Sequence, residues 1–264
     1  MVQGVTEFLP VSSTAHLILV PWLAGWSFDP KVAFVFDVLL QLGTALAVVA
    51  YFWRDLAEIA RETISGLVER RPLASEKARL GWLIVLATIP AVVVGLAFKP
   101  YFESLHRSPL AVVGILTAAA ALIFAVERVG RRNRELSSIT WRDALLIGTS
   151  QSVALFPGVS RSSATICGGM LCHLGRPSAA RFSFLMSVPI LVAASVLAVK
   201  DLLEIPGFTA YLPPLALGFA ASAVVGFASI HWLLSYLARH PMNVFGWYRL
   251  AFGACCFLLN AYRT

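Results

Sequence analysis

The sequence predicts an all-α integral membrane protein with six transmembrane helices and two re-entrant helical hairpins in an inverted repeat. Three observations support this fold class. Of the 264 residues, 58% are hydrophobic and 13% are charged, whereas a soluble domain is about 25% charged. The mean hydropathy of +0.78 is typical of a chain that lies in a bilayer. Prolines interrupt two further apolar regions, and the residues around the two interruptions are similar.

Six apolar segments are long enough to cross a bilayer, which takes about 20 helical residues. They cover residues 32–53, 80–98, 110–127, 182–200, 212–237 and 244–262. Each is expected to form one transmembrane helix.

Two other apolar regions are broken in the middle. Residues 2–24 break at Leu9-Pro10, and residues 143–172 break at Phe156-Pro157-Gly158. Proline removes a hydrogen-bond donor and disfavours a helical conformation in the residue before it. Each arm of the second region is about 13–15 residues, roughly 20 Å of helix, which is too short to span. Both regions are therefore expected to enter the membrane and turn back, with tips buried in protein or lining a wet cavity.

The two broken regions align at a constant offset of 148 residues. Between "QGVTEFLPVSSTAHLI" and "QSVALFPGVSRSSATI", six of 16 positions are identical, including the pairs Gln3/Gln151 and Ser12/Ser160. The chain thus divides into residues 1–136 and 137–264, each a hairpin followed by three spans. Because three is odd, the halves must have opposite orientations, and such repeats place their ligand site where the broken helices face each other.

The same offset pairs Met1 with Thr149, although a full arm, "WRDALLIGTS", precedes the second tip. The first hairpin begins almost at its tip. We therefore expect the natural chain to begin further upstream or to have been trimmed.

Basic residues in the loops indicate the orientation. The side opposite the N-terminus would carry Arg54, Arg61, Arg70, Arg71, Lys77, Arg79, Arg128, Arg131, Arg132, Arg134, Arg142, Arg176, Arg181 and Arg239, and the N-terminal side Lys31, Lys99, Arg107, Lys200 and Arg263. The positive-inside rule makes the richer side cytoplasmic. Both termini are then outside. The basic loops are expected to rest on anionic lipid, and nothing indicates nucleic-acid binding.

Ionisable residues inside a membrane are costly, so those at the hairpin tips are functional candidates. Glu7 precedes the first break, and Ser13 and His16 lie three residues apart after it, on one helix face. Arg161 follows the second break. If the tips meet, one cavity holds a carboxylate, an imidazole, a guanidinium and several hydroxyl groups.

This set of groups suits a phosphate ester or anhydride. Arg161, with Ser160, Ser162 and Thr165 beside it, offers a bidentate fork to phosphate oxygens. Free N–H groups near Ser12 and Ser160, at the start of each second arm, attract anions. His16 or Glu7 can move a proton, and Ser13 could then be a nucleophile. Glu7 can also hold Mg²⁺ or Ca²⁺.

Structural explanations stay open for several of these residues. The hydroxyls of Ser12, Thr14 and Ser163 often bond only a backbone carbonyl in such helices. His16 can be a satisfied core residue, and Arg161 can serve only to neutralise Glu7. Asp37 and Gln41 either line the cavity or reach the interface. Arg249 either extends to the cytoplasm or reaches the site.

Three stretches resemble the undecaprenyl pyrophosphate phosphatase family of the bacitracin-resistance type. "QGVTEFLPVSSTAH" is similar to that family's (E/Q)xxxE signature followed by LPVSST and a histidine, and "PGVSRSSAT" to its PGxSRSxxT. "FDVLLQLGTALAVVAYFW" is the third stretch, with a weaker echo in "GWYRL". The resemblance covers nearly the whole chain.

The resemblance implies hydrolysis of undecaprenyl diphosphate to undecaprenyl phosphate and phosphate. That reaction recycles the lipid carrier for cell-wall synthesis and gives bacitracin resistance. The family also implies a divalent cation and a site in the bacterial plasma membrane that opens to the outside. Its signature adds Gln3 to the substrate-binding residues, but many members have Glu there. This departure leaves Glu7 as the only acid at the first tip.

A secondary transporter or lipid flippase for a phosphorylated substrate is the alternative, because inverted repeats with broken helices also describe transporters. Glu7, Ser13 and His16, crowded at one tip, favour an enzyme. The sequence does not decide between a monomer and a homodimer.

Overall fold

The computed structural model describes residues 1–27, 29–106, 108–203, 207, 209 and 212–263. Arg107, one of the five basic residues assigned to the N-terminal side, lies outside them. The elements are α1 Val2–Phe8, α2 Ser13–Ala24, α3 Pro30–Tyr51, α4 Trp53–Val68, α5 Glu76–Ala97, α6 Lys99–His106, α7 Pro109–Val129, η1 Leu136–Ser138, α8 Trp141–Val153, α9 Arg161–Leu171, α10 Arg176–Leu203, α11 Leu212–Leu237 and α12 Asn243–Arg263. Over the described residues every named element is helical, which confirms the all-α prediction.

Within the described residues, five helices are long and apolar enough to cross a membrane, namely α5, α7, α10, α11 and α12. A sixth span is reached only if α3 and α4, bent by 75° at their junction, count together. The sequence is therefore confirmed as that of a multi-pass helical membrane protein with five or six candidate spans.

Two helices lie where the sequence predicts only loops. The expected loop 54–79 contains α4, and α6 follows α5 almost without a break. In α4, Ile59 and Gly66 are buried while Arg54, Glu58 and Arg61 are exposed. An amphipathic segment with charged residues along one face contains no continuous apolar run, so a search for such runs does not predict it.

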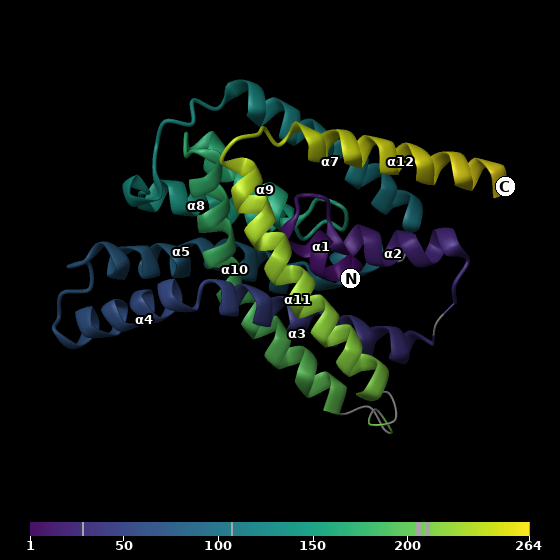
Figure 1. Ribbon diagram of the computed structural model, residues 1–264, viewed down its shortest axis with the longest axis horizontal. Coiled ribbons are helices and arrows are strands. Elements are labelled where there is room, and N and C mark those ends of the chain that lie inside the picture. Colours follow the sequence, from purple (N-terminus) through teal and green to yellow (C-terminus); the bar gives the residue numbers. More distant parts are fainter. Residues whose placement is uncertain (28, 107, 204–206, 208, 210–211, 264) are drawn as a thin grey trace.

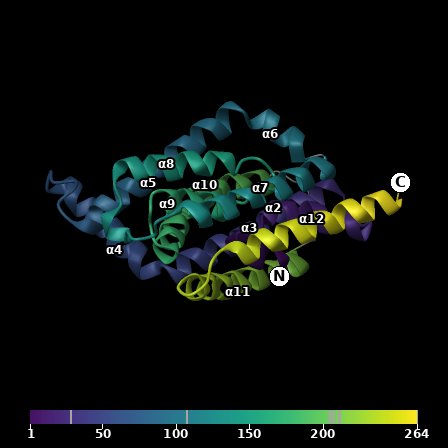
Figure 2. The same cartoon turned by 90° about the horizontal axis from the view of Figure 1, so that it is seen from above.

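The helices pack around the two short broken pairs. Figure 1 shows α1, α2 and α9 near the centre, with α7 and α12 side by side on one flank. On the other flank, α3 packs against both α10 and α11, and Figure 2 shows the same layering from above. Small residues permit close contact, since a Cβ on Gly43 would lie 2.6 Å from Phe219 O.

The first pair breaks at its proline as predicted, whereas the second breaks earlier, because α8 ends before Phe156-Pro157-Gly158. Helix α1 ends at Phe8 because Leu9, which precedes Pro10, is extended (φ −65°, ψ 143°). Helix α8 ends at Val153, and turns occupy residues 154–160 up to the start of α9. Gly158 has φ +108°, and a Cβ there would lie 2.9 Å from Val112 O. Only glycine fits this turn.

The second helices of the two pairs begin in the same way. Ser12 caps α2 with φ 74°, and its hydroxyl accepts a hydrogen bond of 3.3 Å from Ala15 N. Ser160 caps α9 with φ 72°, and its hydroxyl accepts one of 3.3 Å from Ser163 N. Both capping pairs are related by the 148-residue offset. The two helix N-termini therefore present their remaining free N–H groups in matching local geometry.

Candidate active site

A cavity of ≈ 570 Å³ lies between the two broken pairs and the flanking helices α3 and α10. Its polar lining residues are Gln3, Glu7, Ser12, Ser13, Thr14, Asp37, Gln41, Ser160 and Arg161. We call it the polar cavity. The prediction that Asp37 and Gln41 either line a cavity or reach the interface is thereby resolved, because both line this cavity.

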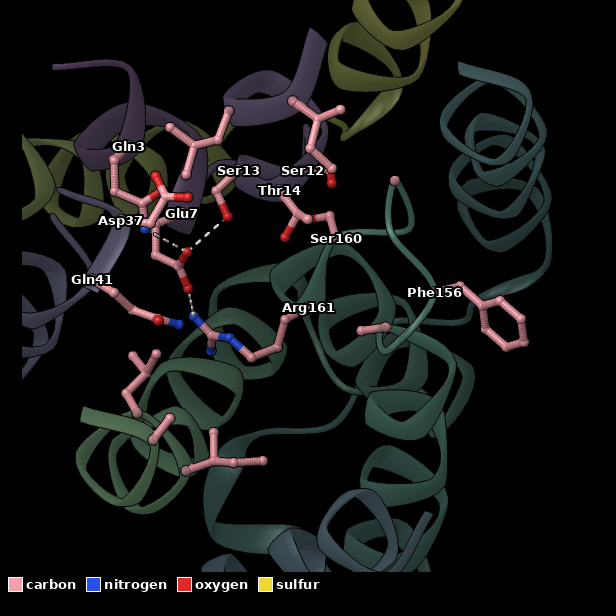
Figure 3. A pocket seen from close by; sticks show the side chains of 17 residues that line it. Gln3, Glu7, Ser12, Ser13, Thr14, Asp37, Gln41, Phe156, Ser160 and Arg161 are labelled. Atoms are coloured by element: carbon pink, nitrogen blue, oxygen red, sulfur yellow. Dashed lines mark hydrogen bonds and ion pairs between the residues drawn. The ribbon is translucent and has the colours of Figure 1, made fainter. Parts of the chain in front are cut away.

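Glu7 lies at the centre of the hydrogen bonds in the polar cavity (Figure 3). Its Oε2 accepts hydrogen bonds from Ser13 Oγ at 2.8 Å and from Gln3 Nε2 at 3.1 Å. Its Oε1 lies 2.9 Å from Arg161 Nη2. Gln3 is one helical turn before Glu7, so α1 alone orients these two side chains together.

Arg161 connects the two broken pairs. It is the first residue of α9, and its Nη2 binds a carboxylate on α1. Its Nη1 is buried and has no protein partner. Gln41 of α3 extends toward the same guanidinium (Figure 3). A guanidinium with one nitrogen paired and one nitrogen unpaired can still donate to an anion in the cavity.

Arg249 of α12 forms a hydrogen bond to each of the two breaks. It is fully buried, and its Nε donates to Pro10 O and its Nη2 to Val159 O, each at 2.9 Å. Of the two alternatives from the sequence, extension to the cytoplasm is excluded. The guanidinium satisfies one carbonyl in each break, where helix hydrogen bonding fails.

His16 faces away from Glu7. Its Nδ1 lies 2.7 Å from Ser12 O, so this nitrogen carries a proton, and its Nε2 lies 2.7 Å from Tyr248 Oη. The ring stacks on Phe252 at 4.6 Å. His16 lines a second, neighbouring cavity rather than the polar cavity. Its expected contact with Ser13 is absent from the hydrogen bonds of the described residues, in which Ser13 pairs with Glu7.

Two of the predicted phosphate-binding hydroxyls are turned toward protein groups. Ser162 Oγ donates to Leu9 O at 3.2 Å, which forms another link between the breaks. Thr165 Oγ1 donates to Arg161 O at 2.8 Å and lies 2.5 Å from Ser183 Oγ. Neither residue lines the polar cavity, whereas Ser12 and Ser160 do.

The oxygen atoms of the lining suit a hard divalent cation. Among the described residues, no three His, Cys, Asp or Glu side chains form a metal cluster. The polar cavity instead holds two carboxylates, Glu7 and Asp37, and the buried Oε1 of Gln3, which has no hydrogen-bond partner. Carboxylate and amide oxygens are the ligands that Mg²⁺ and Ca²⁺ prefer. These three residues would hold such an ion.

The sequence did not predict the contacts of two residues at the breaks. Tyr248, the partner of His16, was not among the predicted site residues, although it lies in GWYRL, the weaker part of the family resemblance. Arg249 was noticed as a charge inside a span, but its partners are backbone carbonyls, which no sequence pattern reveals.

The fold and the site define a multi-pass helical membrane protein with a polar cavity, lined by Arg161 and Glu7, between two broken helix pairs. The chain belongs to the family of the bacitracin resistance protein BacA, whose family model matches residues 1–255.

Curated relatives align over nearly the whole chain. A protein of Chlorobium phaeovibrioides is 45% identical over 275 residues, covering 100% of this chain and 95% of its own. One of Chlorobium limicola is 44% identical, covering 99% and 94%, and one of Moorella thermoacetica is 44% identical, covering 96% and 92%. All three are named undecaprenyl-diphosphatase.

Proposed function

We propose that this protein hydrolyses undecaprenyl diphosphate to undecaprenyl phosphate and phosphate. The reaction would recycle the lipid carrier of cell-wall synthesis and give resistance to bacitracin. The observation that carries the proposal is the network in which Arg161 and Ser13 both bind Glu7 at the facing helix breaks. The names of the relatives, which align over nearly their full lengths, support the same substrate.

Arg161 and the helix N-termini would bind the diphosphate. The buried Nη1 of Arg161 has no protein partner, and a phosphate oxygen would supply one. The caps at Ser12 and Ser160 leave amide groups at the starts of α2 and α9, which favour anions. Arg161 would keep its Nη2 on Glu7 Oε1 while Nη1 binds the phosphate.

Glu7 is the group best placed to take the proton of the attacking hydroxyl. Ser13 Oγ already donates to Glu7 Oε2 at 2.8 Å, while both nitrogens of His16 are engaged elsewhere. The attacking oxygen, from Ser13 or from a water that it holds, forms a bond to the terminal phosphorus. The bond to the bridging oxygen breaks, and its electron pair leaves on undecaprenyl phosphate. If water attacks, phosphate is released directly. If Ser13 attacks, a water then cleaves the Ser13 phosphoester, which releases phosphate and restores the hydroxyl. Mass spectrometry after acid quenching, in search of a phosphate on Ser13, separates the two routes.

His16 would act indirectly in this scheme. Its hydrogen bond to Ser12 O supports the turn that exposes the amides of α2. Ser162 would likewise support the break through Leu9 O. A bound Mg²⁺ or Ca²⁺ would neutralise charge on the diphosphate oxygens, with Glu7, Asp37 and Gln3 Oε1 as its protein ligands.

We further propose six spans and two re-entrant hairpins in an inverted repeat, in the bacterial plasma membrane. The matching caps at Ser12 and Ser160 support the repeat. The distribution of basic loop residues supports external termini and a cavity open to the outside.

Phosphate release from the purified protein in detergent tests the proposal. Undecaprenyl diphosphate with Mg²⁺ or Ca²⁺ should yield phosphate, and the Arg161→Ala variant should yield almost none. Arg181→Ala, which removes a surface pair with Asp55, is the matched control and should retain activity. Lipid movement in liposomes without phosphate release would instead identify a transporter or flippase.

A further inference from the structure

A second cavity, of ≈ 470 Å³, adjoins the polar cavity between α2, α3 and α11. Its apolar walls include Val20, Pro21, Trp26, Phe36, Leu40 and Gly218. We call it the apolar cavity. Gln3, Leu17 and Asp37 line both cavities, so the two spaces meet at these residues.

We propose that the apolar cavity binds the first isoprene units of the substrate, next to the diphosphate. This inference rests on the proposed function, because the diphosphate in the polar cavity fixes where the chain begins. A prenyl chain leaves the head group as a continuous apolar tail, and only an apolar space that meets the polar cavity can receive it.

The size of the apolar cavity limits how much chain it takes. At about 30 Å³ for each heavy atom, the liquid volume of one water molecule, the cavity holds about 15 carbon atoms. That is about three isoprene units. The rest of a 55-carbon chain would lie among the bilayer lipids.

Another apolar hollow in the described part of the chain serves as the alternative route. It lies between α3, α10 and α11 and is lined by Leu42, Ala45, Leu46, Val49, Val192 and Val196. We call it the outer groove. It shares no lining residue with the polar cavity. A chain in the outer groove would therefore not continue directly from the diphosphate.

Chain-length dependence gives the first test. The purified protein is assayed with dimethylallyl (C5), geranyl (C10), farnesyl (C15) and undecaprenyl (C55) diphosphates in one detergent at fixed mole fraction. Because burial of apolar surface drives binding, kcat/KM should rise at least about tenfold for each isoprene unit up to C15. From C15 to C55 it should change less than about threefold. An equal rise beyond C15, or none at all, would overturn the inference.

Two matched valine substitutions locate the chain. Val20→Trp fills the apolar cavity, and Val196→Trp places the same bulk in the outer groove. Val20→Trp should lower kcat/KM for farnesyl diphosphate at least about tenfold, by raising KM. For dimethylallyl diphosphate, kcat/KM should stay within about twofold of its value in the unmodified protein. Val196→Trp should leave kcat/KM unchanged for both farnesyl and dimethylallyl diphosphates.

Should Val20→Trp not fold, Phe36→Ala removes a wall of the apolar cavity without adding bulk. It should lower kcat/KM for farnesyl diphosphate at least about threefold and leave kcat/KM for dimethylallyl (C5) diphosphate almost unchanged. Sensitivity to Val196→Trp alone would place the chain in the outer groove, and insensitivity to every variant would mean that the chain lies in neither. If no diphosphate is hydrolysed even by the unmodified protein, the proposed function itself fails.

Discussion

Arg161 Nη2 and Glu7 Oε1 lie 2.9 Å apart, although the two residues are 154 positions apart in the sequence. Their side chains are 14% and 9% exposed, so the ion pair is largely shielded from water. The sequence left open whether Arg161 only neutralises Glu7 or also binds the ligand. The paired Nη2 and the unpartnered Nη1 are compatible with both roles at once.

The shape of the Arg161 side chain should matter as much as its charge. Arg161→Lys keeps one positive charge but offers a single ammonium to both Glu7 and phosphate. We expect hydrolysis to fall at least about 100-fold, roughly 2.7 kcal/mol of transition-state stabilisation. Arg181→Lys, at a surface pair in which Arg181 Nη2 donates to both oxygens of Asp55, should remain near full activity. Near-normal hydrolysis by Arg161→Lys would remove the phosphate fork from the mechanism.

Glu7 and Arg161 should act as a unit. Glu7→Gln and Arg161→Ala should each lower kcat severely, and the double variant should be hardly worse than the poorer single variant. A double-mutant cycle on phosphate release measures this. The pair Asp55→Asn and Arg181→Ala, distant from the cavity, should leave kcat almost unchanged. If the factor by which kcat falls in the double variant equals the product of the factors in the Glu7 and Arg161 single variants, the two residues act independently.

Arg249 should stabilise both breaks. Arg249→Met keeps an unbranched apolar stem but leaves Pro10 O and Val159 O without their donor. Each unpaired buried carbonyl costs about 1–3 kcal/mol, offset in part by removal of a buried charge. The Tm should fall by roughly 4 °C or more, and hydrogen exchange should accelerate at residues 9–12 and 154–160.

The control for Arg249 comes from the same helix. Arg263 donates to the carbonyls of Trp22 and Leu23 in an exposed position. Arg263→Met should change neither the Tm nor exchange at the breaks appreciably. Equal effects of the two substitutions would mean that burial of Arg249 contributes nothing specific to the breaks.

The orientation can be checked by cysteine labelling in intact cells. Asn133 lies in the basic loop after α7, and Tyr262, which is 89% exposed, lies near the end of α12. In a Cys255→Ser background, which removes an exposed thiol, Asn133→Cys should be labelled only from the cytoplasm. Tyr262→Cys should be labelled only from outside. Labelling of both from one side would contradict the inverted repeat.

Asp143 should make stability depend on pH at the N-terminal end of α8. Burial raises the pKa of this carboxyl, but hydrogen bonds from Arg134 and Thr140 outweigh it and lower the pKa to about 2. Because the unfolded value is about 3.9, this stabilisation is complete above about pH 4 and is lost as the pH falls through 2. Asp143→Asn should lower the Tm at pH 6, and its difference from the unmodified protein should shrink toward pH 2. A difference independent of pH would contradict the ion pair with Arg134.

The sequence predicted the helical class and the first break point because both depend on local chemistry. Apolar runs mark the spans, and Pro10 lies directly after the end of α1. Proline alone does not decide a break, because Pro21, Pro90 and Pro189 lie inside helices and α8 ends at Val153, before Pro157. The amphipathic α4 was missed because its apolar face is narrow and stabilised by α5. Its stability is a tertiary property that a window of sequence does not contain.

The composition of the site was predictable in part, and the pairing within it was not. The tip motifs brought Glu7, Ser13 and Arg161 into consideration, and all three line the polar cavity. The expected pairing of Ser13 with His16 relied on helix spacing alone. In the fold, Glu7 reaches Ser13 across the break, and Tyr248 of α12 binds His16. Distances between separate helices decide such pairings, and spacing within one helix does not.

The position of Arg249 in the last helix has a consequence for biosynthesis. Helices α1, α2, α8 and α9 are complete before α12 leaves the ribosome, yet the guanidinium that joins the two breaks arrives only with α12. Until then the carbonyls of Pro10 and Val159 lack this donor. Chains that stop before α12 would therefore carry the Glu7 and Arg161 motifs without the guanidinium that joins the two breaks.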